Sequence, residues 1–241
     1  MSVQWLTYPD PRATAAACAQ HIGALLDQAL ATQEHATLAV SGGSTPKLLF
    51  QSFVASGLRW QRVHLFFVDE RCVPPNDVES NYRLANENLI TPAHIPASQV
   101  HRIHGEIKPE VAGEQYSEEI RDFFGLEGGE QPHFDVIHCG MGPDAHTASL
   151  FPGVPAIDDR EHIAGAVYVP KMGKWRVTLL PAALLAARNT VFLVAGADKA
   201  ASVGKVFHQD FDPKQYPAQL VSRQGKHVTW FLDQPAAAEL A

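Results

Sequence analysis

Short apolar runs recur along the chain and alternate with amphipathic stretches. The strongest runs are four to six residues long and rich in Val, Leu and Phe, which is typical of strands buried in a sheet. They predict strands at 37–40, 63–68, 134–138, 190–195 and 227–232. Weaker runs at 166–169 and 177–179 predict two further strands.

The stretches between these runs predict helices. Pro46 suits the first turn of a helix, with Thr45 as its N-cap. The segment from His146 to Leu150 is expected to open another helix. The polar, Gly-rich stretch 106–131 predicts a helix and a loop. Further helices are predicted at 81–90, 181–188 and 198–207.

Strands that alternate with helices predict an α/β fold, with a mostly parallel sheet covered on both faces. We find no internal repeat or linker, so we expect one domain over 1–241, with a small edge subdomain near 101–131. Ligands of such sheets bind beyond the carboxyl ends of the strands. Three polar segments follow predicted strands and are therefore expected to form a site: 41–45, 69–71 and 140–146.

Composition narrows the class of protein. The net charge is −7, which argues against a nucleic-acid-binding protein, since such a protein needs a basic face. The three cysteines lack C-x-x-C spacing, so neither a disulfide framework nor a thiolate zinc site is indicated. No apolar run approaches the ~20 residues that span a bilayer. Without a signal segment either, the chain is expected to be a cytoplasmic protein that does not bind membranes.

The segment Ser41-Gly42-Gly43-Ser44-Thr45-Pro46 is a candidate anion site. Its glycines let backbone N–H groups approach a ligand, its hydroxyls can donate, and the following helix N-terminus favours negative charge. The Gly-Lys-Ser/Thr ending of a Walker loop is absent. The alternative is an ordinary strand-to-helix turn.

The segment Asp69-Glu70-Arg71 places three ionisable residues directly after an apolar strand. Such groups are costly to bury unless they are paired. Arg71 can hold a phosphate or carboxylate in a fork geometry, and Asp69 can orient a neighbouring imidazole. The alternative is a strand that runs out into solvent.

The segment from Gly140 to Thr147 formally matches the dinucleotide fingerprint G-x-G-x-x-A. Pro143 removes a backbone donor, however, and Asp144 puts negative charge where a pyrophosphate would sit. A second interpretation is a catalytic His146, held neutral in the first turn of a helix and able to act as a base. The alternative is a structural or solvent-exposed histidine. Ala145 is expected at φ < 0, since a left-handed conformation costs a non-Gly residue ~1–2 kcal/mol.

Further cations and histidines complete the candidate set. Lys171, Lys174 and Arg176 lie close together and suit an anionic substrate, although for Lys174 we favour a charged, solvated loop. His101 and His104 have a spacing that suggests metal only weakly, so no metal site is expected.

Several sequence blocks together resemble the glucosamine-6-phosphate isomerase/6-phosphogluconolactonase family. The segment 41–47 and the block FFVDERCVPPNDVESNYRLA at 66–85 carry the first part of the resemblance. FDVIHCGMGPDAHTASLFPG at 134–153, RVTLLP at 176–181 and HVTWFLD at 227–233 carry the rest. The chain departs from the family at Ala145, where Gly is usual, and at 172–175, where prolines are usual.

The resemblance implies a three-layer α/β/α Rossmann-like domain. It also implies hydrolysis of 6-phosphogluconolactone in the pentose phosphate pathway, without an organic cofactor. His146 would be the base and Asp69 a second catalytic residue. Arg71, Lys171, Arg176 and the loop residues Gly42, Gly43, Ser44 and Thr45 would bind the sugar phosphate. Backbone N–H groups near 140–142 would stabilise the oxyanion.

Three further expectations concern alternatives and partners. A glucosamine-6-phosphate deaminase or a related sugar-phosphate isomerase would use the same pocket for proton transfer. A non-catalytic sugar-phosphate-binding regulator would need a DNA-binding or partner segment, and none is visible. The expected partner is the small sugar-phosphate substrate, bound by a monomer or small homo-oligomer.

Overall fold

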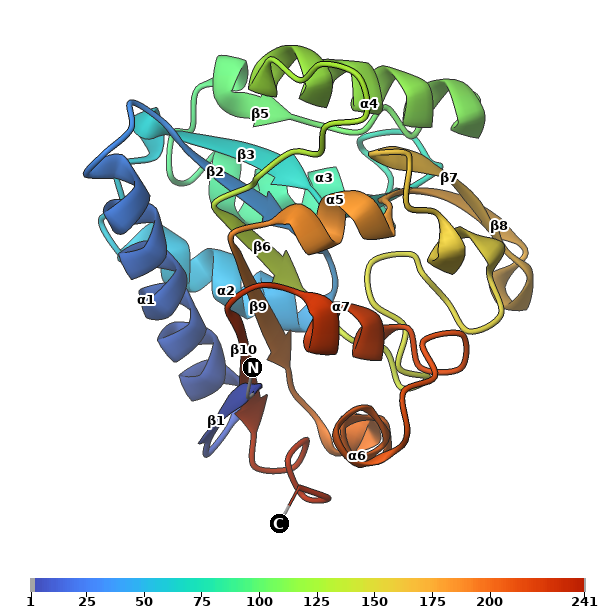
Figure 1. Ribbon diagram of the computed structural model, residues 1–241. Helices are drawn as coiled ribbons and strands as arrows, with labels where there is room; N and C mark the ends of the chain where they lie inside the picture. The colour runs from blue at the N-terminus through green and yellow to red at the C-terminus, as the bar shows by residue number, and fades with distance from the viewer. Residues whose placement is uncertain (1–2, 241) are drawn as a thin grey trace.

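The computed structural model describes residues 3–240 and is built on a seven-stranded, all-parallel sheet (Figure 1). Its strand order is β1-β10-β9-β6-β2-β3-β5. All five residues of β2 are buried, as expected for a parallel strand covered on both faces. The strands are β1 (Gln4–Tyr8), β2 (Ala36–Val40), β3 (Val63–Phe67), β5 (Val100–His101), β6 (Val136–Cys139), β9 (Asn189–Val194) and β10 (Val228–Asp233).

Three more strands form a second, antiparallel sheet of order β4-β8-β7. They are β4 (Asp69–Arg71), β7 (Ala164–Val169) and β8 (Lys174–Leu179). The two weaker strand predictions are therefore confirmed as strands, but they lie outside the parallel sheet. The segment 69–71, expected to be a loop, is a short strand because it pairs with β8.

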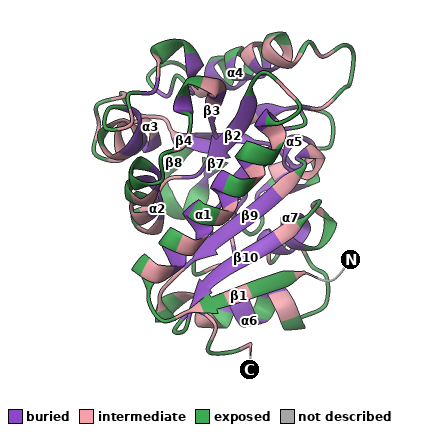
Figure 2. Cartoon of the chain, turned by 90° about the vertical axis from the view of Figure 1, so that its left-hand side faces the viewer, coloured by how far each residue is buried: buried purple, intermediate pink, exposed green. Residues whose placement is uncertain are grey.

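Helices cover both faces of the parallel sheet, which confirms the three-layer α/β/α arrangement. α1 lies on one side of the sheet and α5 and α7 on the other (Figures 1 and 2). α4 packs against β7 and β8, so it links the edge of the parallel sheet to the smaller sheet. The α-helices are α1 (Pro11–Leu30), α2 (Ser44–Ala55), α3 (Asn81–Ala85), α4 (Pro109–Phe124), α5 (Pro181–Ala186), α6 (Ala200–His208) and α7 (Ala218–Gln224).

Several short helical segments complete the fold. A π-helical turn, η2 (Asn86–Ile90), continues α3, so the predicted helix over 81–90 is present in two parts. The 3₁₀ turns are η1 (Trp60–Arg62), η3 (Ala97–Gln99), η4 (Pro155–Asp158), η5 (Pro170–Met172) and η6 (Ala197–Lys199). None of the helices within residues 3–240 combines the length and hydrophobicity needed to cross a membrane.

The structure differs from the predicted elements at several places, and β5 and α7 were not predicted from the sequence. α2 starts at Ser44 with Gly43 as its N-cap, so Thr45 lies inside the helix. No helix follows β6: the stretch 140–153 consists of turns and an isolated bridge between Thr147 and Leu150. β1 and α1 were not assigned from the sequence, although Asp10, which caps α1 through Oδ1, and Pro11 are a typical helix start.

Candidate active site

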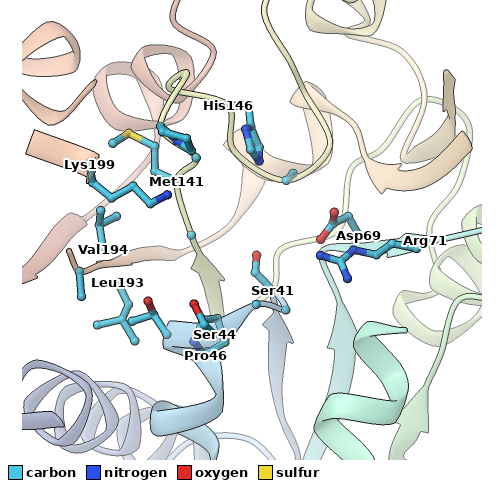
Figure 3. Close-up of a pocket in the computed structure, with 18 of the residues that line it drawn as sticks. Ser41, Ser44, Pro46, Asp69, Arg71, Met141, His146, Leu193, Val194 and Lys199 are labelled. Carbon is cyan, nitrogen blue, oxygen red and sulfur yellow. The ribbon is translucent and has the colours of Figure 1, made fainter. Parts of the chain in front are cut away.

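A cavity of about 240 Å³ lies at the carboxyl ends of β2, β6 and β9. Loops that follow these strands form its walls, together with side chains from β4 and β8. Figure 3 shows Lys199 on one side, Asp69 and Arg71 on the opposite side, and His146 between them. The lining residues predicted from sequence are Gly42, Gly43, Ser44, Thr45, Asp69, Arg71, His146 and Arg176.

The N-terminus of α2 lines this cavity and is its candidate anion-binding part. Gly43 has φ 119°, a conformation that favours glycine, and no described side chain caps the helix. The first backbone N–H groups of α2 are therefore available to an anion. A Cβ on Gly42 would lie 1.8 Å from Oδ1 of Asn81, so only glycine allows α3 to approach this loop. Ser41 fixes the loop to β6, because its Oγ donates to the carbonyl of His138 (3.1 Å).

Asp69 lies at the opposite side and is almost fully buried. Oδ2 accepts a hydrogen bond from Ser149 Oγ (2.7 Å) and lies 3.7 Å from Nη1 of Arg176. Asn81 Nδ2 donates to the carbonyl oxygen of Asp69 at 2.8 Å. Asp69 makes no hydrogen bond to His146 within residues 3–240, so the expectation that it orients the imidazole is wrong.

Glu70, the neighbour of Asp69 in β4, is held by hydrogen bonds from β4 and from the start of α3. Its carboxylate accepts hydrogen bonds from Ser80 Oγ and from the backbone N–H groups of Arg71, Asn81 and Tyr82 at 2.7–2.9 Å. Burial raises the pKa of Glu70, and these four donors oppose that rise. The carboxylate thereby ties β4 to the start of α3. The segment 69–71 is thus a paired, buried strand rather than one that runs out into solvent.

Arg71 and Arg176 lie opposite one another on β4 and β8, and both line the cavity. Nη1 of Arg71 donates to the carbonyl of Glu79. The Nε atoms of both arginines are buried and have no hydrogen-bond partner among the described residues. Burial lowers the pKa of Arg176, while Asp69 opposes the shift. Two cations therefore lie together at one end of the cavity, as an anionic ligand requires.

His146 is held by a tight turn instead of a helix. The N–H of Ala145 donates to the carbonyl of Gly142 (3.0 Å), and the N–H of Gly142 donates to the carbonyl of His146 (2.9 Å). Ala145 has φ 62°, so the prediction of a negative φ is wrong: reversing the chain between Gly142 and His146 requires a left-handed residue. The helix-dipole argument for a neutral His146 also fails, because the residue lies outside any helix.

Asp144 orients the imidazole in place of Asp69. Its Oδ1 lies 2.5 Å from Nδ1 of His146, and its Oδ2 accepts from Nζ of Lys171 (3.1 Å). Burial opposes ionisation of Asp144, but the hydrogen bonds from His146 and Lys171 hold its pKa well below the usual range. An ionised Asp144 accepts from an Nδ1–H group, which selects the tautomer of the neutral imidazole in which Nε2 can take a proton.

The remaining cations divide between site and surface. The side chain of Lys171 is 69% exposed and lies outside the cavity, where it contacts the site through Asp144. Lys174 pairs with Glu79 on the surface, so it is exposed as expected, but it is the first residue of β8 and does not lie in a loop. Lys199, which the sequence analysis missed, lines the cavity and pairs with Asp198 (2.9 Å). Its position just beyond β9, in a fourth strand-end segment, is the signal that could have identified it.

The histidines considered for metal binding have other partners. His101 lies between Nδ1 of His64 (2.9 Å) and Oε1 of Glu119 (2.7 Å), and His104 lies beside Glu106. Among residues 3–240 no group of three His, Cys, Asp or Glu side chains has the arrangement needed to hold a metal ion.

Comparison with known proteins shows similarity over nearly the whole chain. A family model described as glucosamine-6-phosphate isomerases/6-phosphogluconolactonase matches residues 9–230. A 6-phosphogluconolactonase from Synechocystis sp. is 38% identical over 218 residues, which cover 89% of either sequence. The solved 6-phosphogluconolactonase from Trypanosoma cruzi has a TM-score of 0.88 at 26% identity, covering 100% of this chain and 97% of the other. A monomeric glucosamine-6-phosphate deaminase has a TM-score of 0.82 at 18% identity, covering 98% of this chain and 100% of the other, and shares the fold alone.

Proposed function

The chain belongs to the glucosamine-6-phosphate isomerase/6-phosphogluconolactonase family, and we propose that it hydrolyses 6-phospho-D-glucono-1,5-lactone to 6-phospho-D-gluconate. The observation that carries the proposal is the pairing of His146 with an ionised Asp144 at the wall of a cavity lined by three cations. Water is the only co-substrate of this reaction, so it requires no organic cofactor.

His146 serves as the general base. Since Asp144 accepts the proton on Nδ1, Nε2 can take a proton from water as the water oxygen attacks the lactone carbonyl. Protonated His146 then returns the proton to the ring oxygen when the C–O bond of the tetrahedral intermediate breaks. General base catalysis of this kind contributes ~10²–10⁴-fold, which suffices for an activated ester.

The cations and the α2 N-terminus bind the charged substrate. Arg71 with the loop 42–45, or Arg71 with Arg176, holds the phosphate, and Lys199 adds positive charge from the far wall. The N–H of Gly142 is not a donor for the oxyanion, because it already binds the carbonyl of His146. Asp69 fixes Arg176 and Ser149, and so shapes the wall of the cavity that faces the substrate.

The test is His146→Asn, assayed by following acid release from freshly formed 6-phosphogluconolactone, with the enzyme-free rate subtracted. We expect kcat to fall by ~10²-fold or more with little change in KM. A kcat near that of the wild type would show that His146 only holds structure or substrate, and Asp69 would become the candidate base.

The same preparation distinguishes the alternative reaction. A glucosamine-6-phosphate deaminase would release ammonia from glucosamine 6-phosphate, whereas the proposed enzyme releases none. The deaminase alternative is supported at the level of the fold alone.

A further inference from the structure

The aromatic ring of Phe151 lies flat against the imidazole of His146. The two ring centroids are 4.0 Å apart and the planes differ by 21°. Phe151 is only 5% exposed, so its ring is a fixed part of the structure. It follows His146 in the same irregular segment, beyond the bridge between Thr147 and Leu150.

This contact restricts a motion that the hydrogen bond to Asp144 leaves open. A single hydrogen bond at Nδ1 fixes one edge of the imidazole, but the ring can still tilt about that contact. The imidazole lies close against Gly142, where a Cβ would be 2.0 Å from Cε1 of His146, so the absence of a side chain there leaves room for the ring. Phe151 limits the tilt through the ring face. The hydrogen bond to Asp144 and the ring of Phe151 thus constrain the imidazole at its edge and at its face.

Phe151 is itself held by elements far away in the sequence. It packs with Val154, Val167 and Val169 in a small apolar cluster separate from the main core. The guanidinium carbon of Arg176 lies 5.7 Å from the centroid of its ring, in a cation–π arrangement. The sheet β4-β8-β7 therefore supports the imidazole through Phe151.

We infer that Phe151 is a positioning residue for the lactone hydrolysis, because its flat ring sets the plane of His146 and so the direction of Nε2. The inference rests on the proposed function, in which Nε2 takes the proton from water. A proton transfer is sensitive to such geometry, since misplacement of a group by about 1 Å can cost ~10²-fold. A branched aliphatic side chain fills similar space but offers no flat surface to the imidazole.

The experiment compares Phe151→Leu with Phe151→Tyr, which keeps the flat ring. Val169→Ala is the matched control, because it weakens the same apolar cluster without touching His146. We expect Phe151→Leu to lower kcat by ~10- to 100-fold with KM within about 2-fold, and Phe151→Tyr to restore most of kcat. Val169→Ala should lower the Tm and leave kcat near that of the wild type.

A spectroscopic measurement on the wild type tests the stacking even if Phe151→Leu does not fold. In ¹H–¹³C NMR spectra of the wild type, assigned with His146→Asn, the ring protons of His146 should be shifted upfield by the ring current of Phe151. The absence of this shift, or a kcat of Phe151→Leu equal to that of Val169→Ala, would overturn the inference. Equal losses in Phe151→Leu and Phe151→Tyr would overturn it too. Failure of the proposed function would give a different result, because His146→Asn would then keep its lactonase activity.

Discussion

Replacing Asp144 with Asn tests the tautomer of the catalytic imidazole. Oδ1 of Asp144 lies 2.5 Å from Nδ1 of His146, and Oδ2 lies 3.1 Å from Nζ of Lys171. An Asn has one acceptor and one donor for these two partners. If its NH₂ group faces His146, Nδ1 must accept, so the proton moves to Nε2 and the base is lost. If its oxygen faces His146, the NH₂ group opposes the ammonium of Lys171.

The expected loss follows from this mismatch. Asp144→Asn should lower kcat by ~10²–10⁴-fold, because the wrong tautomer removes general base catalysis while the cavity keeps its shape. Asp144→Ala should lose less, since it lets the imidazole exchange between its two tautomers. Lys171→Met combined with Asp144→Asn should regain part of kcat, since the amide can then turn its oxygen to Nδ1.

The assay is initial-rate lactone hydrolysis at several substrate concentrations, with the spontaneous rate subtracted at each pH. A circular dichroism spectrum and a Tm measured for each variant check that it is folded. If Asp144→Asn kept a kcat close to that of the wild type, or if Asp144→Ala were the slower variant, Asp144 would not control the tautomer of His146.

Three further predictions concern binding and stability. Arg71→Ala should raise KM for the phosphorylated lactone far more than for gluconolactone, since a charge-assisted pair contributes ~1.5–3 kcal/mol. Equal losses on both substrates, or a selective loss in Lys199→Ala alone, would contradict the assignment of Arg71 to the phosphate. Ala145→Gly should raise the free energy of unfolding by about 0.5–1 kcal/mol in urea titrations. The reason is that relief of the backbone strain at φ 62° exceeds the entropic cost of glycine. No gain in the free energy of unfolding would mean that the turn is unstrained. Burial lowers the pKa of His138 to about 3 and, with nearby His101 and His35, that of His64 to about 4. The unfolded chain then binds more protons, so Tm should fall as pH drops from 6.5 to 4, and His138→Leu should flatten this dependence.

The sequence alone determined which segments meet at the site. Apolar runs separated by helical stretches predict a parallel sheet, and the carboxyl ends of parallel strands share one edge. The loop after β2 and the segment after β6 could therefore be assigned to one cavity, although about 100 residues separate them. The chemical roles of these segments could also be predicted from local sequence. The properties of glycines before a helix, and of a histidine in a Gly-rich turn, depend little on distant residues.

Only the tertiary structure decided which side chains touch. Asp69 and Asp144 both follow strands, but β4 pairs with β8 and so directs Asp69 to Arg176 and Ser149. Asp144 reaches His146 because Ala145 adopts a left-handed conformation, which local propensity disfavours and the surrounding contacts impose. The stacking of Phe151 on His146 depends on the same turn and on an apolar cluster shared with β7. Side-chain direction at such positions depends on pairing and packing between distant segments, which hydrophobic periodicity does not encode.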